Sequence, residues 1–318
     1  MTEPVASGKI QETQISRYRS TRGLDYESVP FRLWEKSKKL FWDPADIDFS
    51  QDAIDWQEMS VEEQTMVAMS ARGFMVGEEA VTLDIVPLLR CMSDLGRLED
   101  TMYLSMFAME EAKHTEMFRR WFDAVGADPA SLDDLVRAQQ AAVTQGRTGL
   151  FDGALTRVMR RLDTDKSPRA ILDATLIYNQ LVEGVAAIAG YRRWELTFRR
   201  LGKLPGLEAG IKLTQRDERR HIAYGTYLGR QIIAENPELW DWLEQRWARL
   251  TAGFGGGYDA ADPETRERLA AAGMDDEYQQ QLIKRRLEAL AVARTMNADE
   301  VNASAIEAFE PEELQHVS

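Results

Sequence analysis

The two internal histidines of the chain each stand three residues after a glutamate. Glu111 and His114 lie in "MEEAKHTEMF", and Glu218 and His221 lie in "DERRHIAYG". On an α-helix, residues three apart share a face, so each pair would present a carboxylate beside an imidazole. These two groups are suitable ligands for iron or manganese. One such pair is common by chance on an exposed helix. The presence of two pairs is what indicates a metal site.

Two more glutamates stand in apolar surroundings, Glu78 in "FMVGEEAVTLDIV" and Glu183 in "IYNQLVEGVAAIAG". Glu78 precedes Glu111 by 33 positions (111 − 78), and Glu183 precedes Glu218 by 35 (218 − 183). If each interval is an antiparallel helical hairpin, the first midpoint falls beside Gly96 and the second at the start of the predicted turn Leu201–Gly206. Each acid then lies roughly 25 Å from its turn along the helix. Two packed hairpins would bring all four acids to the same depth.

Four carboxylates and two imidazoles in a bundle core need compensation, because an isolated buried charge costs several kcal/mol. Two divalent cations would balance four carboxylates. A glutamate from each of two helices and Glu-x-x-His from each of two others is the known ligand set of ferritin-like di-iron and di-manganese carboxylate proteins. The predicted metal ligands are Glu78, Glu111, His114, Glu183, Glu218 and His221. The bland alternatives are solvated pairs, a buried acid with a local partner, and a metal-free scaffold.

Three acids next to these ligands are left out of the predicted ligand set. Glu79, Glu110 and Asp217 each adjoin a predicted ligand in the sequence. Neighbours on a helix point about 100° apart, so these side chains are expected to face away from the metals.

The elements that must position these residues are helices throughout, since no alternating strand pattern is sustained. Ser60 and Glu63 form a capping box, and Ser167 with Pro168 begins another helix. The long helices are expected at about 60–93, 98–125, 168–200 and 207–235. Shorter ones are expected near 131–144, 149–162 and 238–252. The predicted class is an all-α, ferritin-like four-helix bundle with additional helices and a C-terminal helical extension.

Three regions are expected along the chain. Residues 1–25 lack periodicity and are predicted to be flexible. Residues 26–252 would form the ferritin-like di-metal domain. Residues 253–318 would comprise a glycine-rich linker, charged helices and an acidic tail with little capacity to form a core.

Composition limits the functional classes and the compartment. The 318 residues carry a net charge of −14, which argues against a nucleic-acid surface. Cys91 is the only cysteine, so no intrachain disulfide can form, as suits a cytoplasmic protein. The N-terminus does not resemble a secretion signal, and no apolar run approaches the ~20 residues of a transmembrane helix. We therefore expect a cytoplasmic protein without a transmembrane segment.

Several blocks together resemble a known family. "DPADIDFSQD", "GEEAVTLDIVP", "EEAKHTEMF", "YNQLVEG" and "DERRHIAYG" are similar to the ligand-binding oxidases related to the ribonucleotide reductase small subunit. The resemblance covers about residues 30–235 and leaves the last eighty unmatched. It implies a manganese/iron site that reacts with dioxygen, with di-iron as an alternative. It also implies a long-chain fatty-acid-like ligand in an apolar cavity, with its carboxylate reaching the metals, and a homodimer. The family's ligand positions fall on the same six residues.

The resemblance further implies an ether cross-link between a valine and a tyrosine beside the metals. The matching residues are Val81, three after Glu78, and Tyr178, five before Glu183. Without the family, both would be interpreted as core residues. Tyr178 lies about 140° round an ideal helix from Glu183, so a π-bulge between them is expected to bring it closer.

Two rival functions remain. A radical-generating small subunit of ribonucleotide reductase often has a tyrosine four residues after the first-motif histidine and another in its C-terminal tail. Here Phe118 occupies the first position, and no tyrosine follows Tyr278. A storage ferritin usually has a much shorter chain and would give Val81 and Tyr178 no role.

Overall fold

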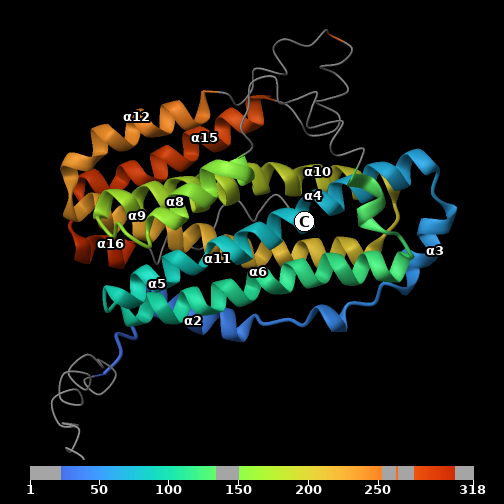
Figure 1. Ribbon diagram of the computed structural model, residues 1–318, viewed down its shortest axis with the longest axis horizontal. Coiled ribbons are helices and arrows are strands. Elements are labelled where there is room, and N and C mark those ends of the chain that lie inside the picture. Colours follow the sequence, from blue (N-terminus) through green and yellow to red (C-terminus); the bar gives the residue numbers. More distant parts are fainter. Residues whose placement is uncertain (1–22, 134–149, 253–262, 264–275, 305–318) are drawn as a thin grey trace, which may run out of the picture.

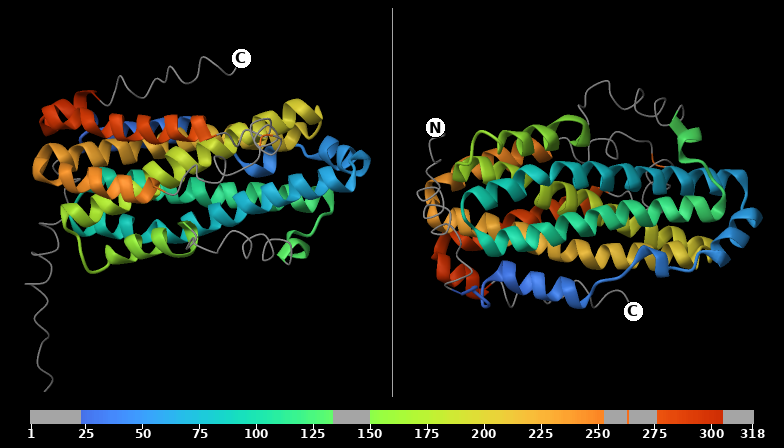
Figure 2. Two further views of the ribbon diagram at one scale, coloured as in Figure 1. Left: turned by 90° about the horizontal axis from the view of Figure 1, so that it is seen from above. Right: turned by 60° about the horizontal axis from the view of Figure 1, so that its bottom comes forward.

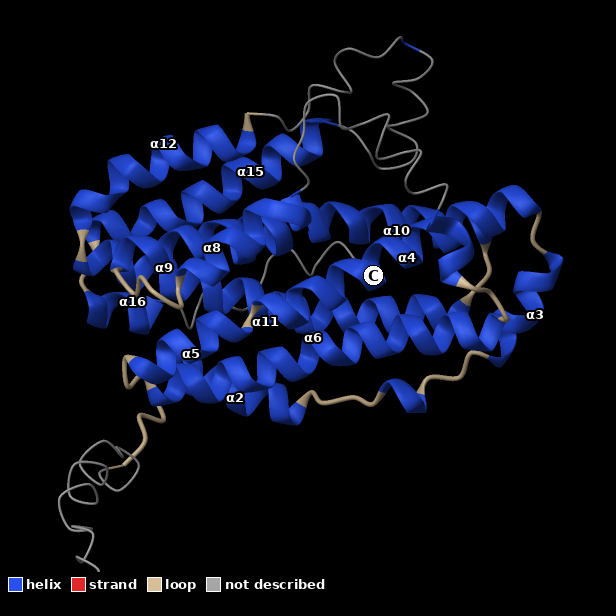
Figure 3. Ribbon diagram, in the orientation of Figure 1, coloured by secondary structure: helices blue, strands red, loops and turns tan. Residues whose placement is uncertain are grey.

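The structure is a computed structural model that describes residues 23–133, 150–252, 263 and 276–304. Within these residues it contains helices and no strand (Figure 3), so the predicted all-α class is confirmed. The α-helices are α2 (Val29–Lys39), α3 (Ser50–Glu58), α4 (Val61–Asp84), α5 (Val86–Asp94), α6 (Leu98–Val125), α8 (Thr156–Arg161), α9 (Pro168–Thr175), α10 (Ile188–Leu201), α11 (Pro205–Glu235), α12 (Trp240–Thr251), α15 (Asp276–Ala291) and α16 (Ala298–Ser304). The π-helices are η4 (Leu150–Leu155) and η5 (Leu176–Ala187), and the short 3₁₀ turns are η2 (Pro44–Asp46), η3 (Pro129–Leu132), η6 (Pro237–Leu239) and η7 (Val292–Thr295).

Four long helical segments run along the longest axis of the molecule and form the expected bundle (Figure 1). They are α4, α6, the continuous α9–η5–α10 segment, and α11. α4 packs against α6, and α11 packs against η5. The members of each pair run in opposite directions, as the hairpin interpretation requires (Figure 2).

Sequence signals at the helix ends act as predicted. The Ser60 hydroxyl accepts from the Glu63 amide while the Glu63 carboxylate accepts from the Ser60 amide, which completes the capping box. Ser167 caps α9, with Pro168 at its first position. Gly126, with φ of 69°, ends α6 in the left-handed conformation that glycine adopts at low cost.

The helix expected over 60–93 is two helices. α4 ends at Asp84 and α5 begins at Val86, with Pro87 in the first turn of α5. Proline has no amide hydrogen to donate to the carbonyl four residues earlier, here that of Leu83, and its ring crowds that carbonyl. The helix is therefore interrupted at Ile85.

The fourth long helix begins at Pro205, two residues earlier than expected. The buried Asp52 of α3 accepts hydrogen bonds from the amides of Gly206 and Leu207, at 2.7 and 2.8 Å. A carboxylate from a distant segment therefore satisfies donors that an isolated helix leaves free.

The apolar core lies on both sides of the Glu111–His114 region of α6. Toward the N-terminal end of α6, Tyr103, Leu104 and Phe107 belong to one buried cluster. Toward its C-terminal end, Met117, Phe118 and Trp121 belong to a second cluster. Glu111 and His114 therefore lie between two apolar regions.

The C-terminal helices contribute more to the core than their charged sequence predicts. Leu282 and Leu290 of α15 and Val301 of α16 are at most 2% exposed and join the first cluster. The expected flexible stretch lies almost wholly outside the described residues, as do the helix predicted over 131–144, the linker and the acidic tail. The division of the chain at residue 252 stays a prediction.

One helical stretch, Pro168–Leu201, has the length and composition of a membrane-spanning helix. However, 83% of its most apolar window is buried inside the protein, as in the core helix of a globular fold. Its apolar character is therefore explained by the bundle that surrounds it.

Candidate metal centre

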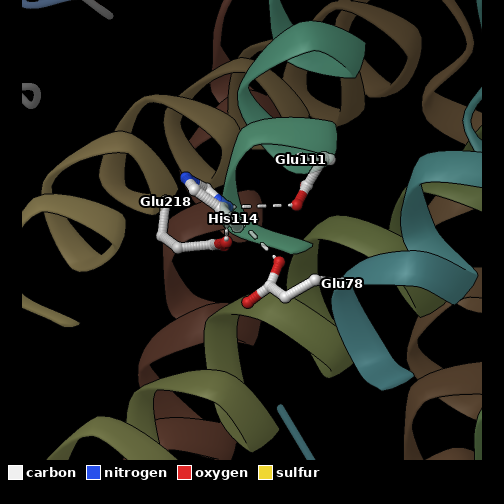
Figure 4. A group of neighbouring side chains, drawn as sticks. All are labelled: Glu78, Glu111, His114 and Glu218. Carbon is white, nitrogen blue, oxygen red and sulfur yellow. Dashed lines mark hydrogen bonds and ion pairs between the residues drawn. The ribbon is translucent and has the colours of Figure 1, made fainter. Parts of the chain in front are cut away.

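The four long helical segments bring the six predicted ligands together in the middle of the bundle. Glu78 comes from α4, Glu183 from η5, and the two Glu-x-x-His pairs from α6 and α11. All six side chains are buried, with Glu78 the most exposed at 6%. In Figure 4, Glu78, Glu111 and Glu218 surround His114, and their polar ends point toward one another.

The six residues form two overlapping groups of four, each with ligand atoms within 4.8 Å of one another. One group is Glu78, Glu111, His114 and Glu218, and the other is Glu111, Glu183, Glu218 and His221. Glu111 and Glu218 belong to both groups, so either could help to hold each of two cations.

Each histidine turns its Nδ1 toward the shared acids. His114 Nδ1 lies 3.3 Å from Glu78 Oε2 and 3.4 Å from Glu111 Oε2. His221 Nδ1 lies 3.2 Å from Glu111 Oε1 and 3.8 Å from Glu218 Oε2. Two imidazoles and four carboxylates thus present nitrogen and oxygen donors to one small volume.

The donor atoms are not satisfied by the protein alone. Four buried atoms of the cluster have no hydrogen-bond partner: Glu111 Oε2, Glu183 Oε1, Glu218 Oε2 and His221 Nδ1. Leaving a buried polar atom unmatched costs about 1–3 kcal/mol, and more for a charged group. Four such atoms facing one volume match what a pair of cations requires, so the residues present fit a dinuclear metal site.

The burial and crowding of these groups also shift their pKa values. Burial raises the pKa of Glu78 and Glu183 well above the ordinary value, and it also raises the pKa of Glu218. Burial lowers the pKa of His114 and His221, but the surrounding carboxylates outweigh it and raise both pKa values well above 6.5. Without metal, protons therefore balance the buried negative charge.

Two acids that sequence reasoning left outside the ligand set hold the far sides of the histidines. Glu110 Oε2 lies 2.9 Å from His221 Nε2, and Asp217 Oδ2 lies 3.3 Å from His114 Nε2. Each acid immediately precedes the ligand glutamate on its own helix. The prediction that they point away from the metals agrees with this placement. Their contact with the histidine of the other helix was missed, and the acid pair at the start of each motif was the available signal.

Two buried cations compensate these bracing acids. Arg220 donates to Glu110 Oε1 and Asp217 Oδ1, at 2.5 and 2.6 Å. Lys113 Nζ donates to Asp217 Oδ2 at 2.8 Å. Trp42 Nε1 donates to the same Asp217 oxygen at 2.7 Å, and its ring lies under the Lys113 ammonium. The outer network therefore carries its own balancing charge.

Tyr178 and Val81 also lie beside the cluster. The Tyr178 hydroxyl donates to Glu111 Oε1 at 3.1 Å, and its ring stacks on Phe107. The π-bulge expected near Tyr178 is confirmed and extends over the whole of η5. In a π-helix the hydrogen bond joins residues five apart, so Tyr178 and Glu183 lie one turn apart. Val81 is 5% exposed.

A cavity of about 450 Å³ opens onto the acids, between α4 and the η5–α10 segment. At the acidic end it is lined by Glu78, Glu111, Glu183, Glu218 and Val81, and away from that end mostly by apolar side chains that include Met66, Met69, Phe74 and Ala187. Mostly apolar cavities of this size, with a few polar groups at one end, are typical of small-molecule sites.

The comparisons with known proteins agree with this geometry. The family model of the ribonucleotide reductase small chain matches residues 26–252. An R2-like ligand-binding oxidase from Sulfolobus acidocaldarius is 35% identical, with a TM-score of 0.75 over 89% of this chain and 97% of that one. A glycine-to-leucine variant of an R2-like ligand-binding oxidase, with a Mn/Mn cofactor, is 33% identical, with a TM-score of 0.76 over 87% of this chain and 98% of that one.

These similarities identify the family of the chain. The chain belongs to the ribonucleotide reductase small chain family and, within it, to the R2-like ligand-binding oxidases. Other similar structures of such oxidases contain Mn/Fe or Fe/Fe cofactors. The family and the carboxylate–histidine cluster together support a di-metal oxidase, which is an oxidoreductase.

Proposed function

We propose that this protein is a dioxygen-dependent manganese/iron oxidase that binds a long-chain fatty-acid-like ligand and joins Val81 to Tyr178 by an ether bond. The observation that carries the proposal is the position of Tyr178. Its hydroxyl is hydrogen-bonded to Glu111, which belongs to both four-residue groups. Val81 lines the cavity onto which the same acid opens.

The proposed metal ligands are the six clustered residues, of which Glu111 and Glu218 belong to both groups of four. The bound metals would supply the redox capacity for a two-electron oxidation of an unactivated C–H bond with dioxygen as oxidant. The protein's own part is to hold the Tyr178 hydroxyl on Glu111 Oε1 and to keep the site dry. The stacking of Phe107 on both Tyr178 and His221 supports that rigid arrangement.

The cross-link has a defined balance of atoms. A C–H bond of Val81 and the O–H bond of Tyr178 break, and a C–O bond forms between the two side chains. Two protons and two electrons leave, and dioxygen accepts the electrons. The chain therefore becomes lighter by two hydrogen atoms.

Mass spectrometry tests this proposal directly. Protein loaded with manganese and iron in air should lose two hydrogen masses and yield a joined peptide containing Val81 and Tyr178. Tyr178→Phe should prevent the joining while keeping both metals, because Tyr178 is not a proposed ligand. Unlinked peptides after full metal and oxygen loading would refute the oxidase assignment.

The ligand set has a separate test. His114→Ala and His221→Ala should each lower the metal content measured by elemental analysis, since each removes one donor from a different group of four. Unchanged metal content in either variant would remove that histidine from the set. Anomalous diffraction at the manganese and iron edges would distinguish manganese/iron from di-iron occupancy.

The main alternative is a radical-generating small subunit of ribonucleotide reductase. The position four residues after His114 is Phe118, a buried side chain without a hydroxyl group. The radical tyrosine that such a subunit often carries at this position is therefore absent. Cross-link formation, with no ribonucleotide reduction in the presence of a large subunit, would favour the oxidase.

We also propose that the protein is a cytoplasmic homodimer, as the family resemblance implies. Exposed apolar side chains on the packed helices α4 and α6 support a dimer, notably Leu83 at 66% and Met109 at 41%. Leu83→Lys should shift the mass measured by light scattering toward the monomer. An unchanged mass would exclude Leu83 from the dimer interface.

A further inference from the structure

One positively charged side chain that lines the cavity has no carboxylate partner among the described residues. Arg193 of α10 lines the cavity, and no carboxylate or hydrogen-bond acceptor pairs with its guanidinium among the residues that the structure describes. Two other largely buried arginines pair with acids. Arg220 pairs with two acids and Arg97 with Asp100. Burial alone lowers the pKa of Arg193, and no neighbouring acid opposes it.

A second unmatched donor belongs to Trp194, the next residue along α10. The indole Nε1 of Trp194 is buried without a hydrogen-bond partner, although the residue is only 2% exposed and lines the same cavity. Guanidinium and indole N–H groups donate hydrogen bonds and cannot accept them. Together they call for an acceptor in the cavity, and the strongest acceptor for a guanidinium is an anion such as a carboxylate.

These donors lie well away from the acidic end. The guanidinium folds back along α10, because Nη2 of Arg193 is 3.6 Å from the position a β-carbon would take on Gly190. Gly190 is seven residues beyond Glu183, which corresponds to roughly 10 Å along a helix. The cavity therefore has an acidic end and a cationic end, roughly 10 Å apart along the helix.

We propose that the ligand is an acyl chain with an anionic group at each end. One carboxylate would face the metals, which rests on the proposed function, and the second would bind Arg193 and Trp194 Nε1. A simple fatty acid would place a methyl group beside these donors and leave both unmatched. A second carboxylate satisfies them and regains the solvation that the guanidinium loses on burial.

Titration calorimetry on the metal-loaded protein tests the proposal. Dodecanedioate should bind at least about tenfold more tightly than dodecanoate, the difference expected from one charge-assisted pair. A series from octanedioate to hexadecanedioate should show an affinity optimum at one length, because both ends must reach fixed partners.

Substitutions of Arg193 should change the preference and not merely the affinity. Arg193→Met should bind the two probes equally, and Arg193→Lys should keep part of the preference. Arg193→Glu should prefer an ω-aminododecanoate, whose ammonium end would pair with the new carboxylate. Arg199→Met is the matched control, since Arg199 is exposed on the same helix and pairs with Glu195. It should leave all affinities unchanged.

The outcomes separate this inference from the function on which it rests. Equal binding of dodecanoate and dodecanedioate, insensitive to Arg193, would overturn the two-ended ligand and leave the oxidase standing. Loss of dodecanoate binding in Arg193→Met would place a single carboxylate at Arg193 and also overturn it. Binding of neither probe would instead refute the acyl ligand of the proposed function.

Discussion

Glu110 Oε2 lies 2.9 Å from His221 Nε2, although the two residues are 111 positions apart and belong to different helices. The mirrored contact joins Asp217 of α11 to His114 of α6. Each of the two helices therefore supplies a glutamate and a histidine to the cluster, and an acid that fixes the imidazole of the other helix. The symmetry makes the two Glu-x-x-His motifs a single unit that neither helix can form alone.

Removing either bracing acid should weaken metal binding without removing a ligand. A carboxylate on the far nitrogen fixes the orientation of an imidazole and raises its basicity, and its loss typically costs roughly 10–100-fold in affinity. We expect that loss in Glu110→Gln and Asp217→Asn, measured by competition with a chelator. Glu116→Gln, on the exposed face of α6, is the control. Affinities equal to that of the control would mean that the braces serve folding only.

Metal binding should change how stability depends on pH. In the folded, metal-free chain the pKa values of Glu78 and Glu183 lie above 4.5, and those of His114 and His221 lie above 6.5. Each group holds its proton to higher pH when folded. The free energy of unfolding therefore falls as pH rises through these folded values.

Bound cations take the place of those protons, so the metal-loaded protein should lose less stability on the alkaline side. The difference in melting temperature between loaded and metal-free protein should widen from pH 6 to pH 9, measured by differential scanning calorimetry. A constant difference would show that protons do not compensate the empty cluster.

The cluster of six residues could be predicted from sequence because it depends on local helical spacing and on the equal depths of two hairpins. Glu111 and His114 share a face on any helix, whatever surrounds it. The role of Glu110 depends on which helix faces α6, and that contact is set by tertiary packing. Arg193 was missed for the same reason, since the lining of a cavity is decided by the gap between two helices. The break before Pro87, by contrast, has a signal in the sequence, because proline interrupts a helix, although one helix was expected over 60–93.

The buried thiol of Cys91 should be unreactive in the folded protein. Cys91 is 0% exposed, and burial raises its pKa to about 11, so almost no thiolate is present at neutral pH. Iodoacetamide should therefore label it only after unfolding in guanidinium, as followed by intact mass. Rapid labelling of the folded chain would require local opening of α5.

Gly225 should be intolerant of even one added methyl group. A β-carbon there would lie 2.0 Å from Cβ of Asn179, whose amide donates to Glu183 Oε2 at 2.9 Å. Gly225→Ala should therefore cost about 1–3 kcal/mol of unfolding free energy by overpacking, and it should weaken metal retention by displacing Asn179. Gly73→Ala is the matched control, because its β-carbon meets nothing within 4 Å. It should gain about 0.5–1 kcal/mol in the metal-free protein through helix propensity. Equal melting temperatures for the two variants would contradict the close approach of α11 to η5.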